Sequence, residues 1–423
     1  MNKFFYRIFL LFIIIAITGC QSVSSSNATP TPNWDEMFDL LGTHQPSTTP
    51  AENGESSPTS TLPAATAISN GENPASSGNG SVNTVWFYKP PENGSLSTVA
   101  DNFDMFILTH RDEDERDEMR ALGMNEPFYQ YLLFVQIMDP ESCTDRPFGN
   151  QVAYKPGDFC QLLAEHPDWF LRDTNGELIR RGDNVFMDPG NEGYREFWLQ
   201  RAKEMQDQFG WDGVFIDNVE GSLAKIYREG VQPANYNDAT YQQAIEGFLA
   251  YLKQNYFEPE NKPVFANIIE LQDVSVWYRY IEHLDGAMIE SFAADYDDRY
   301  LSASDWEYQM EVIRRSQEAG KSLILVTQGR ENDRARQEFA LGSYLLVNNG
   351  QSYFRYTNSD YYNQIWLYDN YSLALGSPLG DMYKVSSAWR RDFEKGYVIV
   401  DPVMNAVEIQ INQKKTQIKN ALE

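Results

Sequence analysis

The sequence is poor in cysteine, histidine and positive charge, and each shortage excludes a class of function. Only three Cys and four His occur among 423 residues, and they form no cluster with zinc spacing. Lys and Arg number 34 against 61 Asp and Glu, which gives a formal net charge of -27. Because an acidic surface repels phosphate backbones, we expect no nucleic-acid partner. The chain also has no Gly-x-Gly-x-x-Gly fingerprint and no Walker loop, so no nucleotide cofactor is predicted.

No motif requires a metal either. The acid-rich stretch Asp295 to Asp298 could hold calcium, but a solvated acidic loop is the favoured interpretation. We therefore predict a protein without cofactor or metal.

The first twenty residues have the composition of an export signal. Lys3 and Arg7 accompany an apolar run, residues 8–17, that is too short for a stable membrane span. The run ends in Ile17-Thr18-Gly19-Cys20, which resembles a bacterial lipobox. We therefore expect a lipoprotein, anchored to the cell membrane through a lipid on Cys20 and facing outside the cytoplasm. An ordinary cleaved secretion signal is the alternative.

Residues 21–82 are rich in Ser, Thr, Pro, Asn, Gly and Ala. Such a segment cannot bury enough apolar surface to offset its ordering entropy, so it is interpreted as a disordered tether. The predicted organisation is then a signal peptide over 1–20, the tether over 21–82, a catalytic barrel over 83–385 and a small β appendage over 386–415.

From residue 84, short apolar runs alternate with amphipathic stretches. Eight runs are predicted as strands, at 84–89, 105–110, 127–137, 213–217, 264–269, 286–290, 323–328 and 352–356. Eight strands with helices between them, over about 275 residues, predict an α/β fold of the (β/α)8 TIM-barrel type. An open doubly wound sheet is the alternative, although its glycine fingerprint is missing.

Two regions interrupt or follow this alternation. The long excursion 138–187 contains Cys143 and Cys160, and in an oxidising compartment we expect a disulfide between them. Asn175-Gly176 within it predicts a hairpin turn. Residues 389–402 and 406–411 read as strands of the C-terminal appendage.

Two segments share one layout. Asp212-Gly213-Val214-Phe215-Ile216-Asp217 and Asp285-Gly286-Ala287-Met288-Ile289-Glu290 both run from Asp-Gly through three apolar residues to an acid. The carboxyl ends of barrel strands open onto the active site, and glycosidic cleavage needs a pair of Asp or Glu residues. We predict Asp217 as nucleophile or base and Glu290 as acid/base. A structural salt bridge or a helix cap is the alternative role of each.

Other acids compete for these roles. Glu270 follows the fifth predicted strand and is the alternate acid, while Glu220 lies three residues after Asp217. Asp188 precedes Pro189-Gly190 and reads more naturally as a turn. Polar and aromatic side chains near other strand ends are predicted to bind substrate, namely Tyr88, Lys89, His110, Asn218, Asn267, Gln328, Arg330, Tyr353 and Arg355. Arg330 and Arg355 could instead be ion partners of the carboxylates.

Several of these motifs resemble a family of hypothetical bacterial glycoside hydrolases with a TIM-barrel fold. The resemblance rests on five segments, Asp188–Asn191, Gly213–Val219, Asn349–Phe354, Gly376–Gly380 and Trp389–Phe393. A weaker likeness exists to the endo-α-1,4-polygalactosaminidase family, through the Asp-Gly-hydrophobic-Asp fourth strand. The resemblance covers most of 84–402 and implies a barrel fold, glycoside hydrolysis and the same carboxylate pair, without indicating the sugar.

The sequence therefore predicts a surface-anchored glycoside hydrolase that cleaves a poly- or oligosaccharide. Aromatic residues make up 14% of the chain and could supply stacking platforms for sugars, although core packing also uses them. A non-catalytic glycan-binding lipoprotein on the same barrel is the alternative. A two-lobed solute-binding lipoprotein is less favoured, because eight successive units indicate a closed barrel. The expected partners are a carbohydrate substrate and the membrane.

Overall fold

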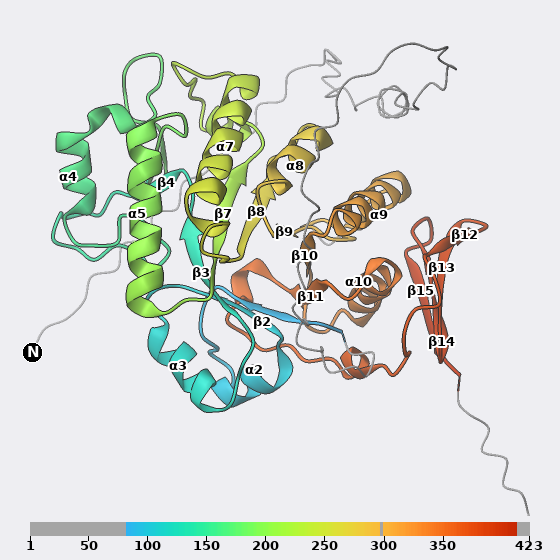
Figure 1. Cartoon of the computed structure of the whole chain (residues 1–423). Coiled ribbons are helices and arrows are strands. Elements are labelled where there is room, and N and C mark those ends of the chain that lie inside the picture. The colour runs from blue at the N-terminus through green and yellow to red at the C-terminus, as the bar shows by residue number, and fades with distance from the viewer. Residues whose placement is uncertain (1–81, 297–298, 413–423) are drawn as a thin grey trace, which may run out of the picture. The chain divides into compact units, whose positions relative to one another are not determined.

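The computed structural model describes residues 82–296 and 299–412, and a ring of parallel strands forms their centre (Figure 1). Eight strands pair in chain order, namely β1 (Val85–Phe87), β2 (Met105–Leu108), β3 (Phe128–Leu133), β7 (Gly213–Glu220), β8 (Val264–Ile269), β9 (Gly286–Ile289), β10 (Ser322–Gln328) and β11 (Ser352–Thr357). A parallel bridge between Thr84 and Phe354 joins the last strand to the first. The sheet is therefore a closed barrel, and the predicted TIM-barrel fold is confirmed.

Helices lie between the strands, as the predicted alternation requires. They are α2 (Leu96–Asn102), α3 (Glu113–Ala121), α5 (Glu192–Phe209), α6 (Ala224–Arg228), α7 (Asp238–Leu252), α8 (Val274–Ile281), α9 (Ala303–Glu318) and α10 (Arg334–Val347). Three of these helices, α5, α7 and α9, begin at a side-chain N-cap. The cap accepts a hydrogen bond from a backbone N–H of the first turn, and the capping residues are Asn191, Asn237 and Ser302. In the described part of the chain, no helix is long and apolar enough to cross a membrane. The predicted signal peptide and nearly all of the predicted tether lie outside the described residues.

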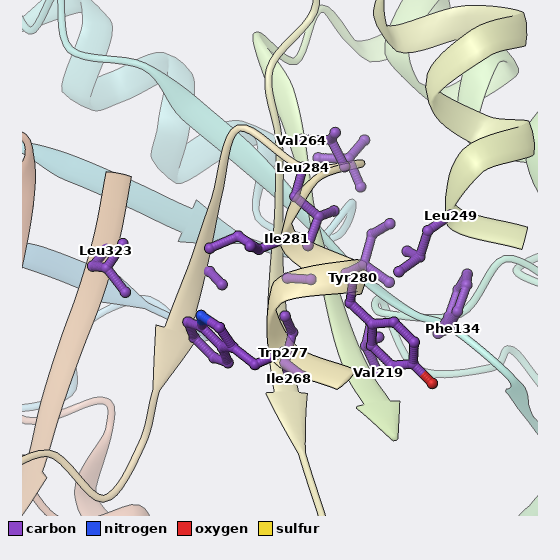
Figure 2. Close-up of a cluster of buried hydrophobic side chains, with 14 of the residues drawn as sticks. Phe134, Val219, Leu249, Val264, Ile268, Trp277, Tyr280, Ile281, Leu284 and Leu323 are labelled. Carbon is purple, nitrogen blue, oxygen red and sulfur yellow. The ribbon is translucent and has the colours of Figure 1, made fainter. Parts of the chain in front are cut away.

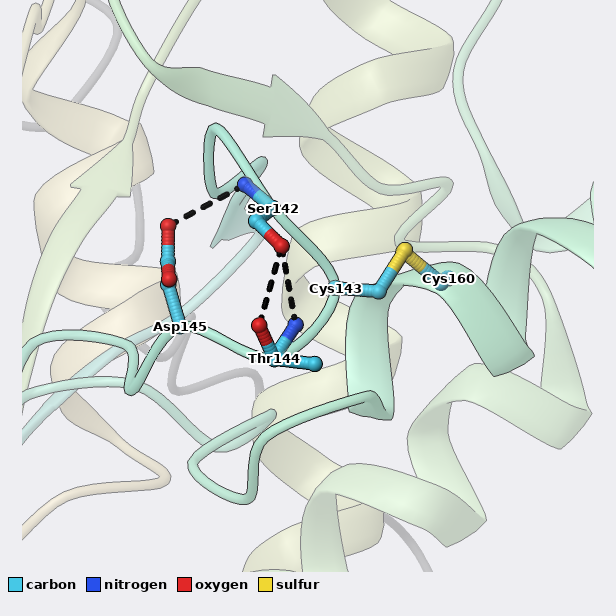
Figure 3. The surroundings of a disulfide bond; sticks show 5 residues. All are labelled: Ser142, Cys143, Thr144, Asp145 and Cys160. Carbon is cyan, nitrogen blue, oxygen red and sulfur yellow. Dashed lines mark hydrogen bonds between the residues drawn. A yellow bond between two sulfur atoms is a disulfide. The ribbon is translucent and has the colours of Figure 1, made fainter.

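The excursion between β3 and β7 forms a second, three-stranded sheet that packs against the barrel. The predicted third strand ends early, because the chain leaves the barrel and forms β4 (Gln136–Met138), which pairs with β6 (Asn184–Phe186) and β5 (Arg180–Arg181). The predicted disulfide is confirmed: Cys143 is bonded to Cys160 on α4 (Asp158–Glu165), with Cα atoms 5.8 Å apart (Figure 3). A short 3₁₀ helix (Pro167–Trp169) precedes the hairpin, and Gly176 supplies the positive φ of 85° at its turn.

The C-terminal tail forms the predicted β appendage. Four antiparallel strands build it, namely β12 (Tyr383–Val385), β13 (Ala388–Phe393), β14 (Gly396–Asp401) and β15 (Ala406–Ile411). The sheet packs on α10, where Arg391 donates to the carbonyl oxygens of Leu345 and Asn348 at 3.1 and 2.7 Å. Two 3₁₀ turns, Ser359–Tyr361 and Asp369–Ser372, lie between β11 and this sheet. The first appendage strand begins at Tyr383, slightly before the predicted boundary.

Strand alternation divides the core into an inner and an outer layer. Inward side chains fill the barrel, among them Val85, Phe87, Met105, Ile107, Tyr129, Phe215, Phe265, Met288, Ile324 and Val326. Outward side chains pack against helices: Figure 2 shows Trp277 and Ile281 of α8 beside Val264 and Ile268 of β8. The period of two residues along each strand therefore separates the barrel filling from the helix contacts.

The Asp-Gly pairs at the start of β7 and β9 have a structural role. Asp212 and Asp285 each use Oδ2 to accept a backbone N–H of the preceding barrel strand, from Phe128 and Val264, both at 2.8 Å. Asp104 does the same for the N–H of Thr84 at 2.7 Å. These acids therefore hydrogen-bond to the first residues of neighbouring strands at the amino end of the barrel. The predicted catalytic acids lie at the opposite, carboxyl end.

The glycines beside them allow the strands to approach. A Cβ on Gly286 would overlap the carbonyl oxygen of Ser322 and the ring of Phe265, and one on Gly213 would overlap the carbonyl oxygen of Pro263. We conclude that the Asp-Gly half of the repeated motif specifies strand packing.

Replacing Gly286 by Ala should destabilise the barrel, because the added methyl group has no space and backbone must move. We expect the free energy of unfolding to fall by about 1–3 kcal/mol, measured by urea denaturation. Gly380→Ala is the matched control, since a Cβ there meets nothing within 4 Å. Equal stability of the two variants would contradict the close approach at Gly286.

Candidate active site

Asp217 and Glu290 lie at the same end of the barrel, where the strands end at their carboxyl termini. Asp217 is on β7 and Glu290 directly follows β9. Asn267 of β8, the strand between them, donates its Nδ2 to Asp217 Oδ1 at 3.1 Å and to Glu290 Oε2 at 2.9 Å. A single amide therefore joins the two predicted catalytic carboxylates.

Three tyrosines complete the hydrogen bonding of these carboxylates. Tyr131 donates its hydroxyl to Asp217 Oδ2 at 2.6 Å. Tyr362 donates to Glu290 Oε1 at 2.8 Å, and Tyr296 donates to Glu290 Oε2 at 3.2 Å. All four carboxylate oxygens thus accept at least one hydrogen bond, which holds both groups in a defined orientation.

None of these tyrosines was among the predicted site residues. Tyr131 could have been found, because it lies on the predicted third strand two residues after Tyr129, with the inward parity of that strand. Tyr296 and Tyr362 lie in loops after β9 and β11. Loops have no periodicity that would reveal the direction of a side chain, so the sequence offered no signal for these two.

The surroundings of Glu290 favour its protonated form. Burial raises the pKa of the Glu290 carboxyl, and the nearby negative charge of Asp217 raises it further. Hydrogen bonds from Asn267, Tyr362 and Tyr296 act in the opposite direction without cancelling the rise. Burial also raises the pKa of the Tyr131 and Tyr362 phenols, so both remain hydrogen-bond donors.

Two predicted substrate-binding residues lie one contact away from the carboxylates. The ring of Tyr88 stacks on Tyr131 with centroids 4.6 Å apart and meets Tyr362 edge-on at 5.3 Å. Gln328 donates Nε2 to the Tyr362 hydroxyl at 2.8 Å. Tyr88, Tyr131 and Tyr362 therefore form an aromatic wall beside the two acids, the kind of surface on which sugar rings can pack.

Arg355, Tyr353 and His110 are not placed to meet a substrate as predicted. Arg355 is buried, and its guanidinium lies over the Trp86 and Phe87 rings. It donates to the carbonyl oxygens of Phe87 and Tyr362 at 3.1 and 2.6 Å, so it supports the loop that carries Tyr362. Burial lowers the pKa of Arg355 to about 9.

Tyr353 points into the barrel as its parity predicts, but at the opposite end. It is near the start of β11, and the charges closest to it are Glu126 and Asp104, which precede β3 and β2. His110 is 3% exposed and packs outside the barrel between the rings of Tyr154 and Phe209. The prediction for both residues was wrong about position. Tyr353 lies too close to the start of its strand, whereas His110 shares the outward parity of Phe106 and Leu108.

The competing acids have other partners. Glu270 forms an ion pair with Arg228, with Oε2 3.0 Å from Nη1, and this pairing lowers the Glu270 pKa. A lowered pKa is the reverse of what a general acid needs. Asp188 accepts hydrogen bonds from Tyr236 and from the N–H of Gly190, as a turn residue.

Glu220, the third competing acid, is fully buried beside Lys225, and burial raises its pKa to about 7.

Asn218, a predicted substrate-binding residue, has φ 58°, and its Oδ1 accepts a hydrogen bond from Lys225 at 2.6 Å. Its predicted contact with substrate is therefore replaced by a contact inside the protein.

The remaining predicted residues lie at the rim. Lys89 and Arg330 are exposed beyond the ends of β1 and β10. Asp295, from the acid-rich stretch that was interpreted as a solvated loop, forms an ion pair with Arg299 at 2.7 Å, and Asp297 and Asp298 lie outside the described residues. Within 82–296 and 299–412, no group of three or more His, Cys, Asp or Glu could hold a metal ion.

Two hydrogen-bonded carboxylates at the carboxyl end of a closed (β/α)8 barrel are the arrangement of a TIM-barrel glycoside hydrolase. The comparison with protein families agrees. The chain belongs to the family described as hypothetical glycosyl hydrolase family 15, whose model matches residues 131–397. A comparison with curated proteins found no match.

Solved structures of distant glycoside hydrolases share the general outline. The glycoside hydrolase domain of PelA from Pseudomonas aeruginosa is 15% identical, with a TM-score of 0.46 over 68% of this chain and 97% of that domain. A noncanonic maltogenic alpha-amylase, AmyB from Thermotoga neapolitana, is 11% identical, with a TM-score of 0.43 over 76% of this chain and 86% of that one. The assignment of the barrel itself rests on the strand order and the closing bridge.

Proposed function

We propose that this protein hydrolyses glycosidic bonds of a poly- or oligosaccharide, with Asp217 as nucleophile and Glu290 as acid/base. The observation that carries the proposal is the shared Asn267 amide, which brings both carboxylates to one point of the barrel mouth. Glu290 has the raised pKa that a general acid needs, and Asp217 accepts hydrogen bonds from Tyr131 and Asn267.

The separation of the acids supports a retaining reaction. Because the two oxygens contact the same nitrogen, they lie at most about 6 Å apart, closer to the ~5–5.5 Å of retaining enzymes than to the ~6.5–9.5 Å of inverting enzymes. In the first step, Glu290 gives its proton to the leaving oxygen while Asp217 bonds to the anomeric carbon. In the second step, Glu290 takes a proton from water, whose oxygen displaces Asp217 and regenerates both groups.

Asp217→Asn and Glu290→Gln should each reduce kcat by several orders of magnitude on any glycan that the wild type cleaves. Both substitutions keep the shape of the side chain and remove the charge or the transferable proton. The measurement is hydrolysis of a glycan panel, with early proton NMR to show that the configuration of the released sugar is retained.

Glu270→Gln is the matched control, because this acid is paired with Arg228 and should not affect kcat. Full activity of Asp217→Asn or Glu290→Gln would overturn the site assignment. A wild type that binds glycans without turnover, with binding unaffected by Glu290→Gln, would favour the alternative of a glycan-binding protein.

The pH profile tests the role of Glu290. As general acid it must be protonated, so kcat/KM should fall as pH rises through its raised pKa, above the ordinary Glu value of about 4.3. The Tyr362 hydrogen bond stabilises the charged carboxylate and lowers this pKa. Tyr362→Phe should therefore move the alkaline limb of kcat/KM to higher pH. A shift to lower pH would contradict the assigned role.

The proposal includes a place of action at the cell surface. The basic n-region, the apolar run and the Cys20 lipobox support export and lipid anchoring, and the Ser/Thr/Pro-rich segment 21–82 supports a spacer of roughly 40 Å reach. Cys20→Ala should release the protein from the membrane fraction, measured by fractionation and immunoblotting. A variant that stays membrane-bound and a wild type without lipid would refute anchoring through Cys20.

A further inference from the structure

Glu220 and Lys225 are buried charged residues that the proposed chemistry does not use. Glu220 ends β7 with no exposed surface, and Lys225 on α6 is 7% exposed. Lys225 Nζ lies 3.4 Å from Glu220 Oε1, and Glu220 also accepts hydrogen bonds from Gln136 and Tyr241, each at 3.3 Å. Charged groups this deeply buried need their partners, and the loss of one leaves an uncompensated charge.

Lys225 also contacts the residue next to Asp217. Its Nζ donates to Asn218 Oδ1 at 2.6 Å, and the Asn218 N–H donates to Asp217 Oδ1 at 2.8 Å. A continuous series of contacts therefore runs from Glu220 through Lys225 and Asn218 to the nucleophile. We call Glu220, Lys225 and Asn218 the Lys225 network.

The Lys225 network lies at an irregular point of β7. The register with β8 shifts between Ile216 and Val219, so that Asp217 and Asn218 together face a single residue of β8, as in a β-bulge. Asn218 has φ 58°, a left-handed conformation that few residues other than Gly and Asn adopt. Its N–H is thereby turned to the Asp217 carboxylate, whereas a regular strand residue would direct it to a neighbouring strand or to solvent.

We propose that Lys225, held by Glu220, is a positioning residue that fixes this bulge and so the orientation of the Asp217 carboxylate. The inference rests on the proposed function, since it gives Asp217 the attack on the anomeric carbon. Within the described residues, Lys225 is the only member of α6 that donates a hydrogen bond to Asn218. The neighbouring cation Arg228 is directed to Glu270 instead.

The test replaces Lys225 by Met in the full chain, which removes the charge and the donor but keeps most of the length. We expect kcat to fall about 10- to 100-fold while KM stays within about 3-fold, because misorientation of a nucleophile affects the transition state more than binding. Arg228→Met is the control, since it removes a cation from the same helix outside the Lys225 network. Its kcat should equal that of the wild type.

A second variant keeps the test decisive if Lys225→Met fails to fold. Asn218→Gly permits the positive φ but removes the acceptor of Lys225, and its kcat should also fall. Crystal structures of the folded variants should show the Asp217 carboxylate displaced from the Tyr131 hydroxyl. Unchanged kcat, or an undisplaced Asp217, would overturn the inference. If the wild type cleaves no glycan, the proposed function fails, and the position of Asp217 in the variants alone decides whether the Lys225 network orients it.

Discussion

The alternation of side chains along a closed ring of parallel strands is the constraint on which the rest of the structure depends. Successive inward positions read Phe215 then Asp217 on β7, and Met288 then Glu290 at β9. The apolar member of each pair fills the dry interior, where an isolated charge would be costly. The acid follows two residues later, at the open end of the barrel. On each strand, one alternation step therefore separates the side chain that packs in the interior from the acid of the candidate site.

The two acids would repel each other without the groups between and around them. Asn267 donates to both, and Tyr131 and Tyr362 donate to the outer oxygens. Burial and the neighbouring charge raise the Glu290 pKa, while the surrounding donors limit this rise. Glu290 therefore has the raised pKa that a general acid needs, while it shares the Asn267 amide with Asp217.

The sequence predicted those features that depend on periodicity. The eight strands and the inward parity of Asp217 and Glu290 follow from the alternation of apolar residues. The disulfide between Cys143 and Cys160 follows instead from the two cysteines that remain in an oxidising compartment. Tyr296 and Tyr362 were missed because a loop has no period. The early end of β3 was missed because the run 127–137 stays apolar while it passes from the barrel into a second sheet.

Tyr353 and Arg355 show a further limit of sequence reasoning. Both have the inward parity of β11, but one lies near the amino end of the barrel and the other is buried under aromatic rings. Whether an inward side chain meets substrate depends on its height in the barrel and on the loops that cover it. Height depends on the register between strands, and no single strand contains that information.

The repeated Asp-Gly-hydrophobic-acid segment has two roles, one at each end of the barrel. At the amino end, Asp212 and Asp285 accept backbone N–H groups of neighbouring strands, and the glycines allow close approach. At the carboxyl end, hydrogen bonds hold Asp217 and Glu290 in the candidate site, at the cost of burying polar groups and, at Asn218, of a left-handed backbone. Barrel folds separate stability from catalysis in this way. The amino-end hydrogen bonds and the apolar filling stabilise each strand, and this stability allows its other end to remain strained and polar.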